Sequence, residues 1–184
     1  LRLIYDPTDI YKELTQKTLL VYSFTAESNE PIVNEKLIGY DSLLSVYTAT
    51  VDIPETAVFG MIRVAGFDEK GILRFDDNSG DWWHFFVYDQ AGLKQEKASM
   101  KAAASYLGNL RSGLNRNVDY KKALAFLEEE TKLYPNNLSA QIGLTSLLFD
   151  LKKINKDDFY DLMKKHLDKQ PDLNDENTVR AVSR

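Results

Sequence analysis

The segment of residues 75–89, Phe-Asp-Asp-Asn-Ser-Gly-Asp-Trp-Trp-His-Phe-Phe-Val-Tyr-Asp, most constrains the fold of this chain. It joins a polar turn to a strand that carries aromatic side chains at successive positions. Because successive side chains of a strand point to opposite faces, both faces of this strand are apolar and both need a covering layer. The pattern therefore predicts a strand inside a β-sandwich or under another layer of structure.

The two faces of this predicted strand can be assigned from the alternation of its side chains. One face carries the alternate positions Trp82, His84, Phe86 and Tyr88. The other face carries Trp83, Phe85 and Val87. One face can fill a sandwich core, and the other can pack on a helical layer or bind a sugar, whose apolar ring faces stack on aromatic side chains. We interpret the aromatic side chains mainly as packing residues.

Short apolar and alternating runs separated by turns fill the first half of the chain. Further strands are predicted at residues 19–24, 45–51, 58–67 and 72–75. Turns rich in Asp, Asn and Gly are predicted at residues 68–71 and 77–80. Five or more short strands punctuated by turns suggest an antiparallel, immunoglobulin-like β-sandwich over residues 1–95.

The second half has helical periodicity. Helices are predicted at residues 96–114, 120–134, 138–152 and 157–169, and the chain closes on residues 176–184. Asp119 is a good N-terminal cap for the second of these helices, and Pro135 is a good stop signal. Pro135 and Pro171 are 36 residues apart, close to the period of about 34 residues of a tetratricopeptide repeat (TPR). Residues 96–184 are therefore predicted to be TPR-like hairpins, which usually serve as spacers or peptide-binding surfaces.

The composition excludes several classes of function. The chain has no cysteine, which excludes structural disulfides, zinc–thiolate sites, cysteine nucleophiles and C-x-x-C redox pairs within it. Its two histidines, His84 and His166, are interpreted as packing or surface residues, so we predict no metal site, no cofactor and no catalytic residue. The net charge of -5 argues against nucleic-acid binding. The first residue is Leu1, which suggests a processed or excised fragment and leaves the compartment open.

Acidic residues around the aromatic strand raise the possibility of a hydrolase. They are Glu69, Asp76, Asp77 and Asp81. A hydrolase of this kind needs two carboxyl groups at a fixed separation with different pKa values, and acids on adjacent turns usually have neither. A calcium loop is also disfavoured, because placing Gly80 at its sixth position puts Phe75 at the first ligand position.

A set of short motifs runs through most of the chain. They are Tyr-Asp-Pro at 5–7, Tyr-Ser-Phe at 22–24, Val-Asp-Ile-Pro at 51–54, Asp-Asp-Asn-Ser-Gly at 76–80, Val-Tyr-Asp at 87–89 with Gly92, and residues 103–108 before a Tyr-Lys-Lys-Ala helix. Together they resemble the N-terminal region of TlpA-like extracytoplasmic thiol:disulfide oxidoreductases of Bacteroidetes. The resemblance implies a sandwich and a helical segment that precede a thioredoxin fold with a Trp-Cys-x-x-Cys pair, in the periplasm or cell envelope. Because this chain lacks cysteine, the resemblance implies an accessory region and supplies no catalytic residue.

We therefore expect a non-catalytic interaction or spacer region beside a downstream thioredoxin-like domain of the same polypeptide. Client proteins are the other expected partners, and any membrane attachment is expected through an anchor outside this chain. The candidate binding residues are Trp82, Trp83 and Tyr88 on the sandwich, with Tyr120, Phe126 and Tyr134 on the hairpins. The alternative is a carbohydrate-binding module that stacks sugars on Trp82, Trp83, Phe85 and Tyr88.

Overall fold

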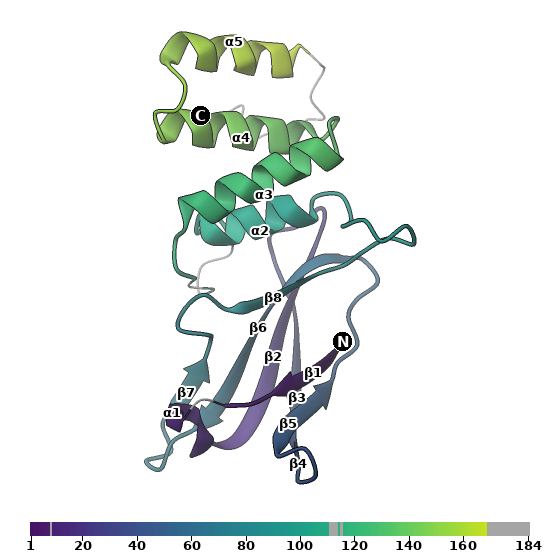
Figure 1. Ribbon diagram of the computed structural model, residues 1–184, viewed down its shortest axis with the longest axis vertical. Helices are drawn as coiled ribbons and strands as arrows, with labels where there is room; N and C mark the ends of the chain where they lie inside the picture. The colour runs from purple at the N-terminus through teal and green to yellow at the C-terminus, as the bar shows by residue number, and fades with distance from the viewer. Residues whose placement is uncertain (8, 111–113, 115, 169–184) are drawn as a thin grey trace.

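The computed structural model describes residues 1–7, 9–110, 114 and 116–168. The strands are β1 (Arg2–Tyr5), β2 (Thr15–Thr25), β3 (Ile32–Leu37), β4 (Gly39–Asp41), β5 (Val46–Thr50), β6 (Ala57–Phe67), β7 (Leu73–Asp76) and β8 (Trp83–Phe86). The helices are α1 (Asp9–Lys12), α2 (Ala98–Tyr106), α3 (Tyr120–Leu133), α4 (Leu138–Asp150) and α5 (Lys156–Leu167). The chain is therefore α+β, as predicted, with the strands at one end and α2 to α5 stacked at the other (Figure 1).

The strands form two antiparallel sheets. The smaller sheet has the order β1-β5-β4, and the larger has the order β3-β2-β6-β7 with β8 also paired to β6. The long strands β2 and β6 lie at the centre of the larger sheet, with Val21 opposite Ile62. Both strands are buried along most of their length, because one face packs towards the smaller sheet and the other towards α2. Burial on both faces explains why their sequences are nearly continuous apolar runs.

The strands predicted at residues 19–24, 45–51, 58–67 and 72–75 are confirmed and overlap β2, β5, β6 and β7, with somewhat different ends. The predicted turn between β6 and β7 is also confirmed. The carboxylate of Asp68 closes it by accepting hydrogen bonds from the N–H groups of Lys70 at 3.0 Å and Ile72 at 2.9 Å. Gly71 has a φ of +72°, which a residue with a side chain adopts only at a cost. Strands β1, β3 and β4 were not predicted.

The aromatic strand differs from its prediction in length and in pairing. Strand β8 begins at Trp83 and ends at Phe86, whereas Trp82 has a φ of +49° and lies in the preceding turn. Tyr88 lies beyond the strand, in an isolated bridge with Lys94. Strands β7 and β8 pair successively with the same edge of β6, so the turn between them does not close a two-stranded hairpin.

The predicted helices are confirmed except for the length of the first. The side chains of Asp119, Asn137 and Asn155 accept backbone N–H groups at the starts of α3, α4 and α5, as N-caps do. Helix α2 is shorter than the predicted 96–114, because the chain turns away at Gly108, which has a φ of +69°. Residues 111–113 of the first predicted helix and the closing segment 176–184 lie outside the described residues.

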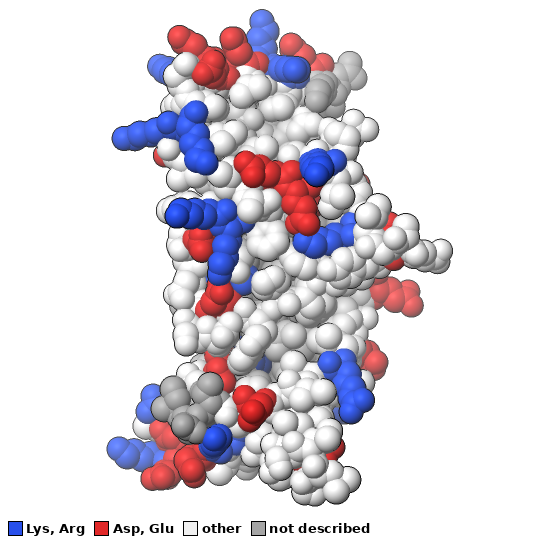
Figure 2. Space-filling model, in the orientation of Figure 1, with Lys and Arg blue, Asp and Glu red and all other residues white. Residues whose placement is uncertain are grey.

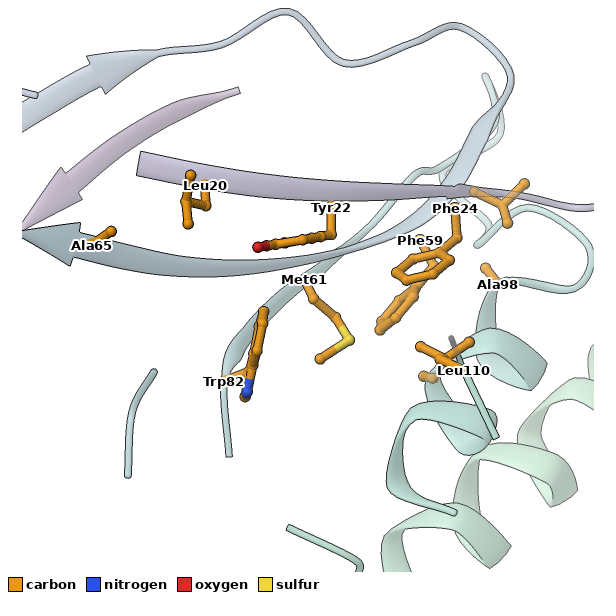
Figure 3. Close-up of a cluster of buried hydrophobic side chains, with 11 residues drawn as sticks. Leu20, Tyr22, Phe24, Phe59, Met61, Ala65, Trp82, Ala98 and Leu110 are labelled. Atoms are coloured by element: carbon orange, nitrogen blue, oxygen red, sulfur yellow. The ribbon is translucent and has the colours of Figure 1, made fainter. Parts of the chain in front are cut away.

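Among the described residues, three clusters of buried apolar side chains hold the layers together. The first lies between the larger sheet and α2, where Phe24 and Phe59 meet Ala98 and Leu110 (Figure 3). The second lies between the two sheets, and the third lies among α2, α3 and α4. Phe126 of α3 packs against both the first and the third cluster. Helix α2 thus shares a core with the sheet, and the boundary near residue 95 stays a prediction.

Candidate functional site

Both faces of β8 are covered by other elements. On one face, the ring centroid of Phe126 of α3 lies 5.7 Å from that of Phe86 and 6.2 Å from that of His84. On the other face, the ring of Trp83 meets Tyr5 of β1 edge-on at 6.0 Å. The aromatic strand therefore lies between the smaller sheet and the helices, as its sequence predicts.

The aromatic residues proposed for sugar stacking do not form one exposed platform. Trp82 is only 2% exposed and belongs to the core between the sheet and α2. Trp83 and Phe85 are half-buried against the core between the two sheets. The ring of Phe85 lies so close to Gly60 of β6 that a Cβ atom there would come within 2.2 Å of it. Tyr88, at 53% exposure, is the most accessible of the four rings.

Lys94, in the loop between β8 and α2, connects three of the predicted binding residues. Its backbone bridges to Tyr88, and its carbonyl oxygen accepts a hydrogen bond from the Tyr134 hydroxyl. Its Nζ lies 5.4 Å from the ring centroid of Phe126. Tyr120, at the start of α3, is 53% exposed and takes no part in these contacts. The structure therefore gathers Tyr88, Phe126 and Tyr134 around one loop, with Phe126 and Tyr134 half-buried.

A buried polar cluster forms around Arg116, in the segment between α2 and α3. Its Nη1 donates to Ser105 Oγ at 2.8 Å, and its Nη2 donates to the Tyr106 hydroxyl at 2.5 Å and to His84 Nδ1 at 3.1 Å. Its Nε lies 3.7 Å from Oδ1 of Asp81. The guanidinium group also lies over the Tyr106 ring, 3.7 Å from its centroid. This one side chain ties β8, α2 and the turn before β8 together.

The cluster shifts the pKa values of its members. Burial, assisted by the Arg116 charge, lowers the pKa of His84 from 6.5 to about 4. Because a guanidinium only donates hydrogen bonds, His84 Nδ1 accepts and its neutral ring carries the proton on Nε2. Burial acts to raise the pKa of Asp81, but the hydrogen bond and charge of Lys122 outweigh it and hold that pKa below its usual value. A neutral imidazole and a carboxylate at pH 7 hold Arg116 in place and do not form a nucleophile–base pair.

A second buried polar group, Glu130 of α3, caps the N-terminus of α2. Its Oε1 accepts the Lys97 N–H at 2.6 Å, and its Oε2 accepts the N–H groups of Ser99 at 3.1 Å and Met100 at 3.3 Å. Asn137 Nδ2 also donates to Oε1 at 2.9 Å. Burial raises the pKa of Glu130, although these hydrogen bonds act in the opposite direction. No sequence signal indicates this role, because Glu130 follows two other glutamates on an amphipathic helix.

An open cavity of about 570 Å³ lies at the end of the sheet away from the helices. It is lined by Tyr11, Leu14, Asp68, Leu73, Arg74, Phe75 and Asp77. The Asp68 carboxylate is already bound by its own turn and by Arg74 Nε at 2.9 Å, and Asp77 accepts the Gly80 N–H at 2.8 Å. These carboxylates thus stabilise turns, and the cavity offers no support for a two-carboxylate hydrolase.

Apolar side chains are exposed at the tip of the β4–β5 hairpin and beside it. Leu43 is 95% exposed, Leu44 57% and Tyr40 58%, and Leu37 at the end of β3 is 70% exposed. The Asp41 carboxylate accepts the N–H groups of both leucines, at 3.0 and 3.2 Å, so the turn is satisfied internally. Figure 2 shows this tip as uncharged surface, whereas charged groups gather beside α1 and over α5. Exposed apolar surface of this kind is typical of interaction sites.

The described residues contain no cluster of three or more His, Cys, Asp or Glu side chains that could hold a metal ion. No helix in this part of the chain is long and apolar enough to span a bilayer. The whole sequence lacks cysteine, which is compatible with the absence of thiol–disulfide activity. Comparisons with protein-family models, with curated proteins and with solved structures find no match to this chain. The resemblance to TlpA-like proteins therefore stays a prediction.

Proposed function

We propose that this chain is a non-catalytic interaction and spacer region of an extracytoplasmic thioredoxin-family thiol:disulfide interchange protein, in the periplasm or cell envelope. In this proposal an immunoglobulin-like sandwich carries TPR-like hairpins. The region holds a thioredoxin-like domain of the same polypeptide in position relative to its client proteins.

The observation that carries the spacer role is the continuous apolar packing from the sheet into the helices. Phe126 belongs to the borders of two core clusters, and α2 packs on both β6 and α3. Helix α3 then packs on α4, and α4 on α5. Consecutive packing of this kind transmits position along the molecule, because close-packed interiors resist compression. Such a body can hold two attached parts at a fixed separation.

The interaction role is supported by what the surface offers. The β4–β5 turn, which carries the exposed leucines, lies at the end of the molecule away from α5 (Figure 1). Strand β3 also exposes apolar side chains. The buried polar groups around Arg116 and Glu130 bind one another and backbone N–H groups, so they serve the fold. These features therefore support protein recognition better than they support a catalytic role.

The proposal is tested by joining this chain to a thioredoxin-fold domain that contains Trp-Cys-x-x-Cys. The control fusion carries an unrelated spacer domain of similar size. We expect this chain to change kcat/KM for a protein disulfide such as insulin, while kcat/KM for a small aromatic disulfide stays the same in both fusions. Equal rates for both fusions on every protein disulfide tried would contradict the proposal, as would insulin reduction by this chain alone.

A further inference from the structure

Strand β3 is the last strand of the larger sheet, and its outer edge is unpaired. The register places Thr18 of β2 opposite Leu37, and the next pair is closed by the Ile38 N–H, which donates to the Lys17 carbonyl at 3.0 Å. In an antiparallel pair, backbone groups alternate between facing the partner strand and facing away from it. The even-numbered residues of β3 therefore bond to β2, and Val33, Glu35 and Leu37 direct their N–H and C=O groups outwards.

Strand β5 contacts β3, but in the described part of the chain it pairs with β1 and β4 and with none of these outward groups. No backbone hydrogen bond outside the β2–β3 ladder involves the N–H of Val33, Glu35 or Leu37 there. The side chains are accessible as well, with Ile32 42%, Val33 46% and Leu37 70% exposed. An unpaired edge with apolar side chains is a template for another strand.

The charges on β3 argue against a second copy of this chain as that strand. Only the outward residues of β3 can form backbone hydrogen bonds with a β3 strand from a second copy. A symmetric antiparallel pair that uses the whole strand therefore places Glu35 opposite Glu35 of the other copy. A register centred on Lys36 places like charges together again. A register centred on Asn34 sets Leu37 opposite Pro31, which has no N–H to donate. Each of these symmetric arrangements therefore either places like charges opposite each other or lacks a hydrogen bond.

We propose that the outer edge of β3 accepts an extended segment of a different protein as an additional antiparallel strand. The segment carries Lys or Arg opposite Glu35 and apolar side chains opposite Val33 and Leu37. Hydrogen bonds from the three outward residues supply affinity, and the charge opposite Glu35 supplies selectivity. This inference deepens the proposed interaction role and rests on it, since it names the surface that binds a client segment.

Two synthetic peptides test the charge requirement. One copies residues 31–37, Pro-Ile-Val-Asn-Glu-Lys-Leu, and the other has lysine in place of its glutamate. Each is added to the ¹⁵N-labelled protein, and amide shifts and hydrogen exchange are followed by NMR. We expect the lysine peptide to slow exchange at Val33, Glu35 and Leu37 and to bind roughly fivefold more tightly than the glutamate peptide, because an opposite-charge cross-strand pair replaces a like-charge pair.

Proline at position 33 provides a matched test of the edge itself. Val33→Pro removes an outward N–H and leaves the β2–β3 ladder intact, whereas Val33→Ala removes only the side chain beyond Cβ. We expect Val33→Pro to abolish binding of the lysine peptide and Val33→Ala to retain it, with unchanged near-UV circular dichroism in both.

Three results would overturn the edge site. They are lysine-peptide shifts that map away from β3, unimpaired binding by Val33→Pro, and sedimentation of the free protein as a dimer that Val33→Pro disperses. The fusion experiment separates this site from the proposed function. If the fusion still discriminates between protein disulfides when it carries Val33→Pro, the interaction role stands and the edge site is wrong.

Discussion

At the scale of single residues, Arg116 makes the clearest contribution to the stability of the fold. Its guanidinium donates hydrogen bonds to Ser105, Tyr106 and His84, and its side chain is fully buried. Removing it leaves several buried polar groups without a partner, and each such group costs roughly 1–3 kcal/mol. We expect Arg116→Met to lower the free energy of unfolding by about 2–4 kcal/mol in urea denaturation.

The control for this substitution is Lys122→Met, because Lys122 pairs with Asp81 in the same cluster but is largely exposed. Exposed ion pairs contribute little, so this change should cost less than about 1 kcal/mol. Equal losses from the two substitutions would mean that charge around Asp81, and not the buried hydrogen bonds of Arg116, stabilises the junction.

His84 makes stability depend on pH. Its pKa is about 4 in the folded protein, below its ordinary value of 6.5. Between these values the unfolded chain binds a proton that the folded chain does not, so the free energy of unfolding falls as the pH is lowered from 6.5 towards 4. We expect His84→Gln, which keeps an acceptor for Arg116 but does not titrate, to reduce this fall in urea titrations at successive pH values. An NMR titration showing His84 protonated near pH 6.5 would contradict the expectation.

At the scale of elements, the sequence predicts those features that are determined by residues close together in the chain. Asp119 and Pro135 predict the start and the end of α3, because an N-cap and a helix-ending proline act within one helical turn. Strand β3 was missed because it is exposed on both faces, and residues such as Val33 and Glu35 then show no alternation to detect. The sequence pattern places Trp82 in the strand, because an aromatic run carries no sign of its φ of +49°.

In the candidate site, too, some features follow from local sequence and others do not. The covering of β8 followed from its own sequence, whereas the cluster around Arg116 did not. His84 and Arg116 are 32 residues apart in the chain, and the contact arises only when β8 and the segment before α3 are brought together. Glu130 and Ser99 are similarly distant, at 31 residues. No periodicity or motif encodes such pairs.

Helix α2 depends on Glu130 for its start. The residue at its N-cap, Lys97, has a φ of +69° and makes no side-chain cap, and Glu130 accepts the N–H groups instead. We expect Glu130→Ala to cost about 2–3 kcal/mol and to speed hydrogen exchange at Ser99 and Met100. Glu128→Ala, at an exposed position of the same helix, should change neither quantity measurably. Unchanged exchange in the Glu130 variant would show that α2 is held by its apolar face alone.

At the scale of the whole molecule, the sheet and the helices are expected to unfold together. Phe126 packs against the clusters on both sides of the junction, and its ring stacks on Tyr106 at 6.0 Å between centroids. Trp82 and Trp83 report on the sheet end, while circular dichroism at 222 nm reports mainly on the helices. In urea the two signals should therefore change at the same midpoint.

The side chain of Phe126 provides the test of this coupling. Truncation of a packed Phe leaves a cavity and costs roughly 3 kcal/mol or somewhat less at a half-buried site, so Phe126→Ala should lower stability by about 2–3 kcal/mol. It should also separate the tryptophan and helical transitions, because both cores lose a contact at the same point. The control is Phe149→Ala, a partly exposed ring that packs on α5 at 4.6 Å from Phe159 and belongs to neither junction cluster. If the wild-type transitions already differ, the two parts are independent units, and a rigid spacer is not what this chain provides.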